Sequence, residues 1–297
     1  MKNISIIIPI FNSEEYLETL FEALQNNRFY EGDEVLLVDN GSTDKSILYC
    51  EKMVNQYPGI YKLLKYTEKP GSYSARNYGV SFAKGDILVF TDSDTKPVEN
   101  WLDAIRDNSK EGVVLAGRII LDIVNNGLWE HFDNIAHLNS EKNAKSSCVA
   151  TANMAVHKTD FFKVGLFEER FSGGDYEWSV RASGKGLKIQ FLNQAIVHHP
   201  TRKSFNQILK KEQRIAYGAG NHYKNLNKPL AELVIVHLLK IFKIDTNIRY
   251  SRKLHNSGLT GKTILEFNIK FMYIRFQQLL FAVKGYNMEN VRKMGIK

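Results

Sequence analysis

Two aspartates, Asp92 and Asp94, stand one residue apart at the end of an apolar run, residues 87–90, in the stretch GDILVFTDSDTKP. Two carboxylates this close together repel each other unless a positive group lies between them. The stretch contains no Lys or Arg before Lys96, so the missing partner could be water, a distant Arg or a metal ion. Mg²⁺ and Mn²⁺ are commonly held by one or two carboxylates together with substrate phosphates. The pair therefore marks a candidate metal site.

The elements that must position these carboxylates alternate regularly over the first hundred residues. Apolar strands are predicted over residues 4–10, 34–39, 60–66 and 86–92. Apolar positions at helical spacing and polar capping residues predict helices over residues 13–26, 42–57 and 72–84. Strands that are apolar throughout and alternate with helices indicate an α/β fold with a mostly parallel sheet covered on both faces.

Beyond residue 110 the alternation becomes irregular. Strands are predicted over residues 112–124 and 147–158, and two short strands within residues 187–199. Helices are predicted over residues 158–167 and 175–186. From residue 204 onward the pattern is helical and basic, so we expect a catalytic domain over residues 1–203 and a helical C-terminal region over residues 204–297.

The ends of the predicted parallel strands gather residues that could bind a nucleotide, because ligands bind beyond the carboxyl ends of such strands. The first strand is followed by Phe11, the second ends at Asp39, and the fourth ends at Asp92 and Asp94. With Arg76 on the helix before the fourth strand, they offer an aromatic face, an acid for a ribose hydroxyl, a cation for phosphate and a carboxylate pair for a metal.

Each of these residues also has a simpler structural interpretation. Asp39 could cap the turn into the next helix, Phe11 could be a core residue, and Arg76 could lie on a helix surface. The first strand is followed by PIFNSEE, without the G-x-G-x-x-G pattern of a dinucleotide site, which argues against a nicotinamide or flavin dehydrogenase. The combination at one sheet edge favours a nucleotide and metal site over the separate interpretations.

Four segments, ISIIIPIFNSEEYL, VLLVDNGSTDKS, GSYSARNYGVSFAKGDILVFTDSDTKP and FSGGDYEWSVRASGKGLKI, closely resemble the family-2 glycosyltransferases in order and spacing. The resemblance covers roughly residues 3–202 and does not extend to the tail beyond about residue 220. It implies the GT-A type of fold, a Rossmann-like sheet with a mixed extension. It also implies transfer of a sugar from a nucleotide-diphosphate sugar.

The resemblance implies roles for particular residues. Those implied to hold the nucleotide sugar are Pro9, Phe11, Asn12, Asp39, Arg76, Asp92 and Ser93. Asp92 and Asp94 match the D-x-D motif, with Asp94 implied as the direct metal ligand. Asp175 matches the acid that acts as catalytic base, and Glu177 and Trp178 are implied to shape the acceptor side.

One segment extends this set and another departs from the family. VHHPTR resembles a V-x-H-x-x-R element, which favours His199 over His198 as a further metal contact. One of the two histidines could instead face away from the site. The family often has Glu-Asp before the base, whereas this chain has Gly174-Asp175, so one carboxylate is missing near the acceptor.

The implied reaction is a single displacement that inverts the anomeric carbon. A divalent metal, Mn²⁺ or Mg²⁺, and Arg76 would neutralise the departing diphosphate, while Asp175 would accept the acceptor's proton. Two alternatives stay open at this point. A sugar nucleotidyltransferase would need a Gly-rich basic loop after the first strand, where this chain is acidic, and a non-catalytic carbohydrate-binding protein would not need Asp94 and Asp175 together.

Charge is unevenly distributed along the 297 residues. Residues 200–297 contain 19 Lys or Arg and 5 Asp or Glu, a net charge of +14, and the first 199 residues carry −6. A basic region interleaved with apolar residues predicts peripheral contact with an anionic membrane, although packing of Phe267, Phe271, Ile274 and Phe281 within the protein would explain its apolar residues as well.

Location and partners follow from the same features. The two cysteines, Cys50 and Cys148, are far apart and favour a reducing cytoplasm. The apolar segment before Pro9 is too short for a signal peptide, so we expect a cytoplasmic protein, peripheral at the inner membrane face. The expected partners are a UDP-sugar donor and a glycan or lipid-linked acceptor, and no nucleic acid.

Overall fold

The computed structural model describes residues 2–287, and these form two compact units. Unit 1 comprises the residues up to 122 together with 138–169 and 174–200. Unit 2 comprises 123–137, 170–173 and the residues from 201 onward. The functional boundary between residues 203 and 204 stays a prediction, and the two units are described separately below.

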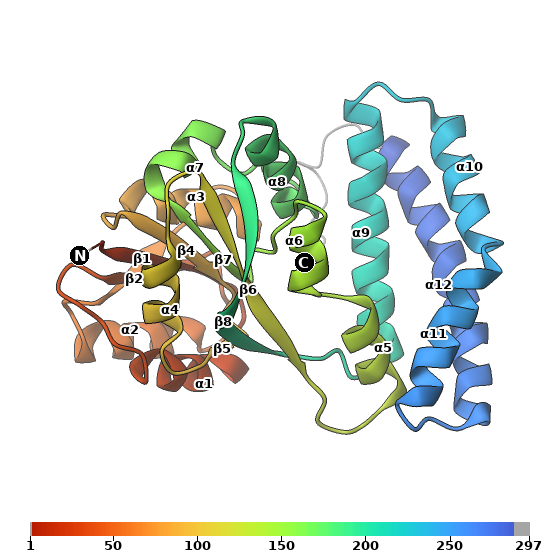
Figure 1. Ribbon diagram of the computed structural model, residues 1–297, viewed down its shortest axis with the longest axis horizontal. Helices are drawn as coiled ribbons and strands as arrows, with labels where there is room; N and C mark the ends of the chain where they lie inside the picture. Colours follow the sequence, from red (N-terminus) through yellow and green to blue (C-terminus); the bar gives the residue numbers. More distant parts are fainter. Residues whose placement is uncertain (1, 288–297) are drawn as a thin grey trace. The chain divides into compact units, whose positions relative to one another are not determined.

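Unit 1 is built on one eight-stranded sheet with the order β3-β2-β1-β4-β7-β6-β8-β5 (Figure 1). The strands span Ile4–Ile10 (β1), Glu34–Asp39 (β2), Tyr61–Lys65 (β3), Ile87–Thr91 (β4), Lys96–Pro97 (β5), Val113–Asp122 (β6), Asn153–His157 (β7) and Lys188–Pro200 (β8). The first four strands pair in parallel. Antiparallel β7 joins β4 to β6, so a parallel half meets a mixed extension, which confirms the predicted fold class.

Helices cover both faces of this sheet because successive side chains of a strand point to opposite faces. Ile6 and Ile8 of β1 pack in one apolar core and Ile7 packs in the other. The first core includes residues of α1 (Glu14–Gln25), α2 (Ser46–Gln56) and α4 (Trp101–Asn108). The second includes residues of α3 (Ser72–Phe82), α7 (Lys158–Val164) and α8 (Gly174–Gly184). A short helix, α6 (Ser140–Lys145), packs on β6 and β8.

The segment predicted as two short strands, residues 187–199, is one strand, β8. Its pairing with β6 is interrupted, because Gly117 lies opposite Leu192 and the next residue lies opposite Ile196. The Nδ2 of Asn153 donates to the carbonyl oxygen of Ala195 at 2.9 Å inside this irregularity. A side chain on a third strand therefore satisfies the backbone where the ladder breaks, and the strand continues.

Unit 2 is helical over its described residues (Figure 1). Its helices span Leu128–Ala136 (α5), Phe205–Asn225 (α9), Leu230–Ile241 (α10), Ile244–Asn256 (α11) and Gly261–Asn287 (α12). Trp129 and Phe132 of α5 form its core with Phe267, Phe271 and Ile274 of α12.

The apolar residues noted in the tail therefore pack within unit 2, which is the alternative that the sequence left open. Among residues 2–287, no helix is long and apolar enough to cross a bilayer.

Candidate active site

The strand register brings the predicted nucleotide-binding residues to one edge of the sheet. Ile10 at the end of β1 lies opposite Asp39 at the end of β2, and Ile7 of β1 lies opposite Phe90 of β4. Pro9 is half-buried near the end of β1. The expected gathering at the carboxyl ends of the parallel strands is therefore present.

The ends of β1 and β4 are joined directly through two hydroxyl groups. The Oγ of Ser13 lies 2.7 Å from the Oγ of Ser93, so Ser93 is hydrogen-bonded to the residue that directly precedes α1. Asn12 has a positive φ of 47°, and its Oδ1 accepts from the backbone N–H of Thr43 at 2.8 Å. Phe11, which directly follows β1, is 41% exposed, so its aromatic ring is a surface group and not a core residue.

Asp39 is almost fully buried, and its carboxylate accepts from the backbone N–H groups of Gly41 at 3.1 Å and Ser42 at 3.2 Å. It therefore caps the turn after β2, as its simpler interpretation proposed. A carboxylate has lone pairs beyond those used here, so the turn role does not replace the predicted ribose contact, which stays a prediction.

Asp92, Asp94 and His199 form a group whose potential ligand atoms all lie within 4.8 Å of one another. The two aspartates follow β4, and His199 comes from β8, which is more than a hundred residues away in sequence. Nδ1 of His199 donates to the carbonyl oxygen of Pro200 at 2.8 Å, and this hydrogen bond orients the ring with its other nitrogen, Nε2, toward Asp94.

The second ring nitrogen of His199 faces the aspartate pair. Its Nε2 lies 3.5 Å from Oδ1 of Asp94, which is longer than an ordinary hydrogen bond. Two carboxylates and a neutral imidazole nitrogen are a suitable donor set for Mn²⁺ or Mg²⁺, so the residues present fit a divalent metal.

Arg76 of α3 is buried and forms an ion pair with the carboxylate of Asp92. Its guanidinium also lies over the ring of Tyr73, 5.5 Å from the ring centre. Arg76 is therefore not a surface residue. Of the two adjacent carboxylates, Asp92 has as its partner an arginine that lies earlier in the sequence. Arg76 provides one positive charge beside two negative ones.

His198 lies in a different hydrogen-bonded group from His199. Its Nδ1 is 2.6 Å from Oδ1 of Asp122, and Nζ of Lys96 is 3.1 Å from Oδ2 of the same carboxylate. Partial burial pushes the pKa of Asp122 upward, but the hydrogen bonds from His198 and Lys96 outweigh it and leave the pKa below its ordinary value. The geometry thus brings His199 to the aspartate pair and gives His198 a separate partner.

Asp175 lies at the start of α8 and is half-buried. Its Oδ1 accepts from the hydroxyl of Tyr73 at 3.1 Å and from the backbone N–H of Tyr176 at 2.9 Å. Burial raises the pKa of Tyr73, and the negative charge of Asp175 raises it further. Tyr73 was not among the predicted site residues. Its position three residues before Arg76 places both on one face of α3, which is the signal that could have found it.

The Gly-Asp departure has a structural reason in the same place. A Cβ at position 174 would lie 2.8 Å from Cε2 of Tyr73, closer than real Cβ atoms approach other atoms. The ring of Tyr73 thus fills the space that a side chain at position 174 would need.

The two residues expected to shape the acceptor side, Glu177 and Trp178, are both buried. Trp178 is fully buried, its ring stacks on Phe161, and its Nε1 donates to the carbonyl oxygen of Gly165 at 2.8 Å. Glu177 is also buried and pairs with Arg181 at 2.5 Å. α8 therefore turns the Trp178 side chain into the core, and the role of Glu177 and Trp178 in shaping the acceptor side stays a prediction.

Comparison with known proteins agrees with this geometry. The sequence model for glycosyl transferase family 2 matches residues 5–171. Glycosyltransferase AglE of Haloferax volcanii is 32% identical over 221 residues, which cover 72% of this chain and 72% of the relative. The minor teichoic acid biosynthesis protein GgaA of Bacillus subtilis is 40% identical over 239 residues, 77% of this chain but only 48% of that protein.

Solved structures are similar in fold at low sequence identity. Mannosyltransferase PcManGT from Pyrobaculum calidifontis, in complex with GDP-Man and Mn²⁺, superposes with a TM-score of 0.63 at 16% identity, over 95% of this chain and 86% of that one. S. aureus TarS 1-349 in complex with UDP-GlcNAc gives a TM-score of 0.52 at 18% identity, over 96% of this chain and 90% of that one. With the family match over more than half of its length, the chain belongs to glycosyl transferase family 2 and is a glycosyltransferase of the nucleotide-sugar type.

Proposed function

We propose that the protein is a metal-dependent, inverting glycosyltransferase that moves a sugar from a nucleotide-diphosphate sugar to a hydroxyl group of an acceptor. The observation that carries the proposal is the Asp92, Asp94 and His199 group, connected through Arg76 and Tyr73 to Asp175. This series links a set of metal-ligand atoms to a half-buried carboxylate within unit 1.

The donor-binding part of the proposal assigns roles to the sheet edge. Asp94 and His199, with Asp92, would hold Mn²⁺ or Mg²⁺, which supplies positive charge to the leaving diphosphate when bound. Arg76 is held beside this group by its ion pair with Asp92, so its charge is already in place. The exposed ring of Phe11 offers a stacking face for the base, and Pro9, Asn12, Asp39 and Ser93 line the same edge.

The acceptor part assigns the proton transfer to Asp175. Its carboxylate accepts the proton of the acceptor hydroxyl as that oxygen attacks the anomeric carbon, on the face opposite the departing diphosphate. One displacement inverts the configuration, and no covalent sugar intermediate is needed. A carboxylate works as the base because the hydroxyl becomes acidic only as the new bond forms.

The identity of donor and acceptor is proposed from chemistry and from the relatives. GDP-Man and UDP-GlcNAc occupy the two fold neighbours, and we propose a UDP-sugar for this chain. GgaA is named for minor teichoic acid biosynthesis, which supports a cell-envelope glycan or a lipid-linked saccharide as the acceptor.

A panel of nucleotide sugars, assayed with and without Mn²⁺ for thermal stabilisation and for release of nucleoside diphosphate, tests this proposal. A true donor stabilises the folded protein by mass action. A nucleotidyltransferase would release pyrophosphate, and a binding protein would release neither product. The Asp175→Asn variant should bind the donor normally and lose at least ~10²-fold in turnover, and near-normal turnover would place the base elsewhere.

The second part of the proposal is a peripheral contact of unit 2 with an anionic membrane at the cytoplasmic face. The apolar residues buried in unit 2 leave a different stripe of α12 exposed. Its large side chains are between 39% and 66% exposed and recur at helical spacing: Leu265, Ile269, Met272, Phe276 and Leu280.

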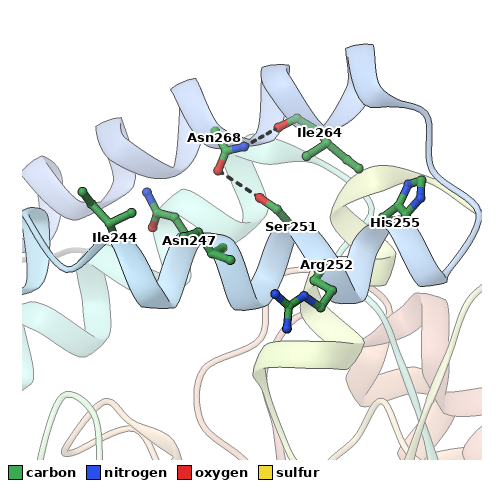
Figure 2. A pocket seen from close by; sticks show the side chains of 8 residues that line it. Ile244, Asn247, Ser251, Arg252, His255, Ile264 and Asn268 are labelled. Atoms are coloured by element: carbon green, nitrogen blue, oxygen red, sulfur yellow. Dashed lines mark hydrogen bonds between the residues drawn. The ribbon is translucent and has the colours of Figure 1, made fainter.

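A shallow pocket lies between α11 and α12 (Figure 2). Its lining residues on α12, Ile264 and Asn268, are next in sequence to Leu265 and Ile269 of the stripe. Ile244 and Ile248 line it and are largely exposed. Residues 228–287 contain ten Lys or Arg and three Asp or Glu. Positive charge of this size opposes contact with a second copy of the same surface and favours an anionic bilayer.

Vesicle co-sedimentation tests this contact. The protein should bind anionic vesicles at low salt, lose binding as salt rises, and lose it in the Ile269→Asp/Phe276→Asp variant. Leu48→Asp is the matched control, because Leu48 is 63% exposed on α2 of unit 1. No binding of the wild-type protein at low salt would contradict the membrane contact and leave the transferase proposal intact.

A further inference from the structure

We infer that Tyr73 is the positioning residue for the proposed base: it holds one oxygen of Asp175 so that the other oxygen is presented to the acceptor hydroxyl. The inference rests on the proposed function of Asp175 and adds a residue that the family motifs do not supply. It depends on three observations, which are the hydrogen bonding of Asp175, the immobility of the Tyr73 ring and the fit between that ring and Gly174.

The two carboxylate oxygens of Asp175 have different surroundings. Oδ1 accepts from both the Tyr73 hydroxyl at 3.1 Å and the Tyr176 backbone N–H at 2.9 Å. Within the part of the chain that the structure describes, Oδ2 of Asp175 receives no hydrogen bond. Two donors on one oxygen, from a side chain and from the helix backbone, fix the plane of the carboxylate and leave the lone pairs of the second oxygen for a substrate.

The Tyr73 ring is held in place on several sides, so its hydroxyl is a rigid donor. The ring contacts Phe167 with the ring centres 5.8 Å apart, and the Arg76 guanidinium covers one face at 5.5 Å. Because Arg76 also pairs with Asp92, the ring stands between the arginine of the metal group and the proposed base. Burial raises the pKa of the Tyr73 hydroxyl, so it remains a protonated donor at the pH of the cell.

The absence of a side chain at Gly174 leaves room for the Tyr73 ring. A Cβ on residue 174 would lie 2.8 to 2.9 Å from three atoms of the Tyr73 ring. These atoms belong to a rigid ring, so they cannot move away one at a time, as the end of a flexible side chain could. The position before the proposed base, where the resemblance implies a glutamate, thus has no side chain here, and the Tyr73 hydroxyl donates to the base instead. Tyr73 and Gly174 act as a pair.

The first experiment compares Tyr73→Phe, which removes only the hydroxyl, with Tyr78→Phe on the same helix as the matched control. Tyr73→Phe should lower kcat by ~10-fold or more, as expected when a reacting group is misplaced, and leave the KM for the donor and the melting temperature unchanged. The acid limb of the kcat/KM profile should move to higher pH, because a lost donor favours the protonated carboxyl. Tyr78→Phe should change none of these.

The outcomes separate this inference from the proposed function. If Asp175→Asn is inactive while Tyr73→Phe keeps wild-type kcat and pH profile, Tyr73 is not a positioning residue and Asp175 remains the base. If Asp175→Asn retains full turnover, the proposed base is wrong and the role of Tyr73 falls with it. A Tyr73→Phe variant that loses donor affinity as much as kcat would also overturn the inference, because that pattern indicates a donor-binding role.

A double-mutant cycle tests the pairing of the ring with Gly174. Gly174→Ala should impair kcat in the wild-type background, because the new methyl group displaces the ring. In the Tyr73→Ala background the same change should have little further effect, because the space is vacant. Strong coupling between the two changes supports the inference, whereas strictly additive effects on kcat would show that the ring and the base are independent.

Discussion

The candidate site in unit 1 and a polar cluster in unit 2 both combine aspartates with histidine and arginine, but the cluster is buried and the carboxylates of the site are partly exposed. The cluster joins Asp133, His137 and Glu212 with Arg202 and Lys211. Asp133 is fully buried and accepts from Nδ1 of His137 at 2.6 Å and from the backbone of Arg202 at 2.9 Å. In the candidate site, Asp92 and Asp94 are each about one third exposed.

The two histidines show what the difference means. Both ring nitrogens of His137 face carboxylates, at 2.6 Å from Asp133 and 2.8 Å from Glu212, and both can donate only when the ring is protonated. Nε2 of His199 lies 3.5 Å from Oδ1 of Asp94 in the group that could hold a metal ion. The cluster pairs its carboxylates inside unit 2, whereas the carboxylates of the candidate site are partly exposed, so that a ligand can reach them.

The pKa of Lys211 shows that the buried cluster in unit 2 does not favour additional positive charge. Burial together with the charge of Arg202 lowers the pKa of Lys211 to about 7, although Asp133 and Glu212 oppose that shift. A further cation is thus poorly accommodated in unit 2, whereas the potential ligand atoms of Asp92, Asp94 and His199 in unit 1 lie within 4.8 Å of one another.

The largest effect should come from breaking the buried cluster. Asp133→Asn removes the carboxylate that pairs with Arg202 and His137, and should destabilise unit 2 by about 3–5 kcal/mol, the cost of leaving buried charges without a partner. Hydrogen exchange measured by mass spectrometry should show lost protection in peptides of α9 and α5. Retained protection in these helices would show that the cluster contributes little.

Removing a carboxylate from the candidate site in unit 1 should change ligand binding and leave the stability of the fold almost unaffected. Asp94→Asn should leave the melting temperature unchanged or slightly raised, because it relieves repulsion with Asp92. Mn²⁺-dependent binding of the nucleoside diphosphate should fall by at least ~10–100-fold, since loss of groups that merely support metal ligands already costs that much. Calorimetry with UDP and with GDP measures it.

The matched control is Asp122→Asn, which removes the same charge from the carboxylate that pairs with His198 and Lys96. Its affinity for the donor should equal that of the wild type. Equal losses in the two variants would mean that net charge, and not a defined metal site, decides donor binding.

The residues of the site that lie at strand ends could be predicted from the periodicity of the sequence. Phe11, Asp39 and Asp92 could be placed at one edge because parallel strands end together, whatever packs around them. The Tyr73–Asp175 contact joins residues 102 positions apart, and the cluster contact of His137 with Glu212 spans 75. No local pattern encodes such pairs, because tertiary packing alone brings them together.

The same limit applies to Trp178. It follows the proposed base by three residues, and the family motif implies that it shapes the acceptor side. Its position in the sequence does not show that α8 turns its ring into the core beside Phe161. In the tail, helical spacing identified Phe267 and Phe271 correctly as an apolar face. Spacing did not reveal that a second apolar stripe, which includes Ile269 and Phe276, stays exposed.

Acid should weaken unit 2 in a way that depends on the cluster. Burial raises the pKa of Asp133, but His137, Lys211 and Arg202 outweigh it and hold the pKa below its ordinary value, and the pKa of Glu212 is lowered by similar contacts. The unfolded chain therefore takes up protons at higher pH than the folded one, so stability is lost as pH falls through ~4 and below. The loss should be smaller than in Asp133→Asn at neutral pH, since the lowered pKa keeps part of the Asp133 carboxyl ionised in the folded protein when the pH falls.

Urea unfolding between pH 6 and pH 3 measures this dependence, with hydrogen exchange in α9 as the local readout. The slope of stability against pH should be shallower in Asp133→Asn than in the wild type, because the variant lacks one of the titrating groups. An identical slope in both proteins would assign the acid sensitivity to carboxylates outside the cluster.

The smallest effects should separate the two adjacent histidines. His199→Ala removes the imidazole that faces Asp94 and should weaken Mn²⁺ binding by ~10-fold. His198→Ala breaks a partly exposed pair with Asp122, an interaction of the class that contributes about 0–1 kcal/mol, so Mn²⁺ affinity should stay within about twofold of the wild type. Titration of each variant with Mn²⁺ in the presence of UDP gives the comparison. If His198→Ala weakens metal binding more than His199→Ala, then His198, and not His199, is the metal contact on β8.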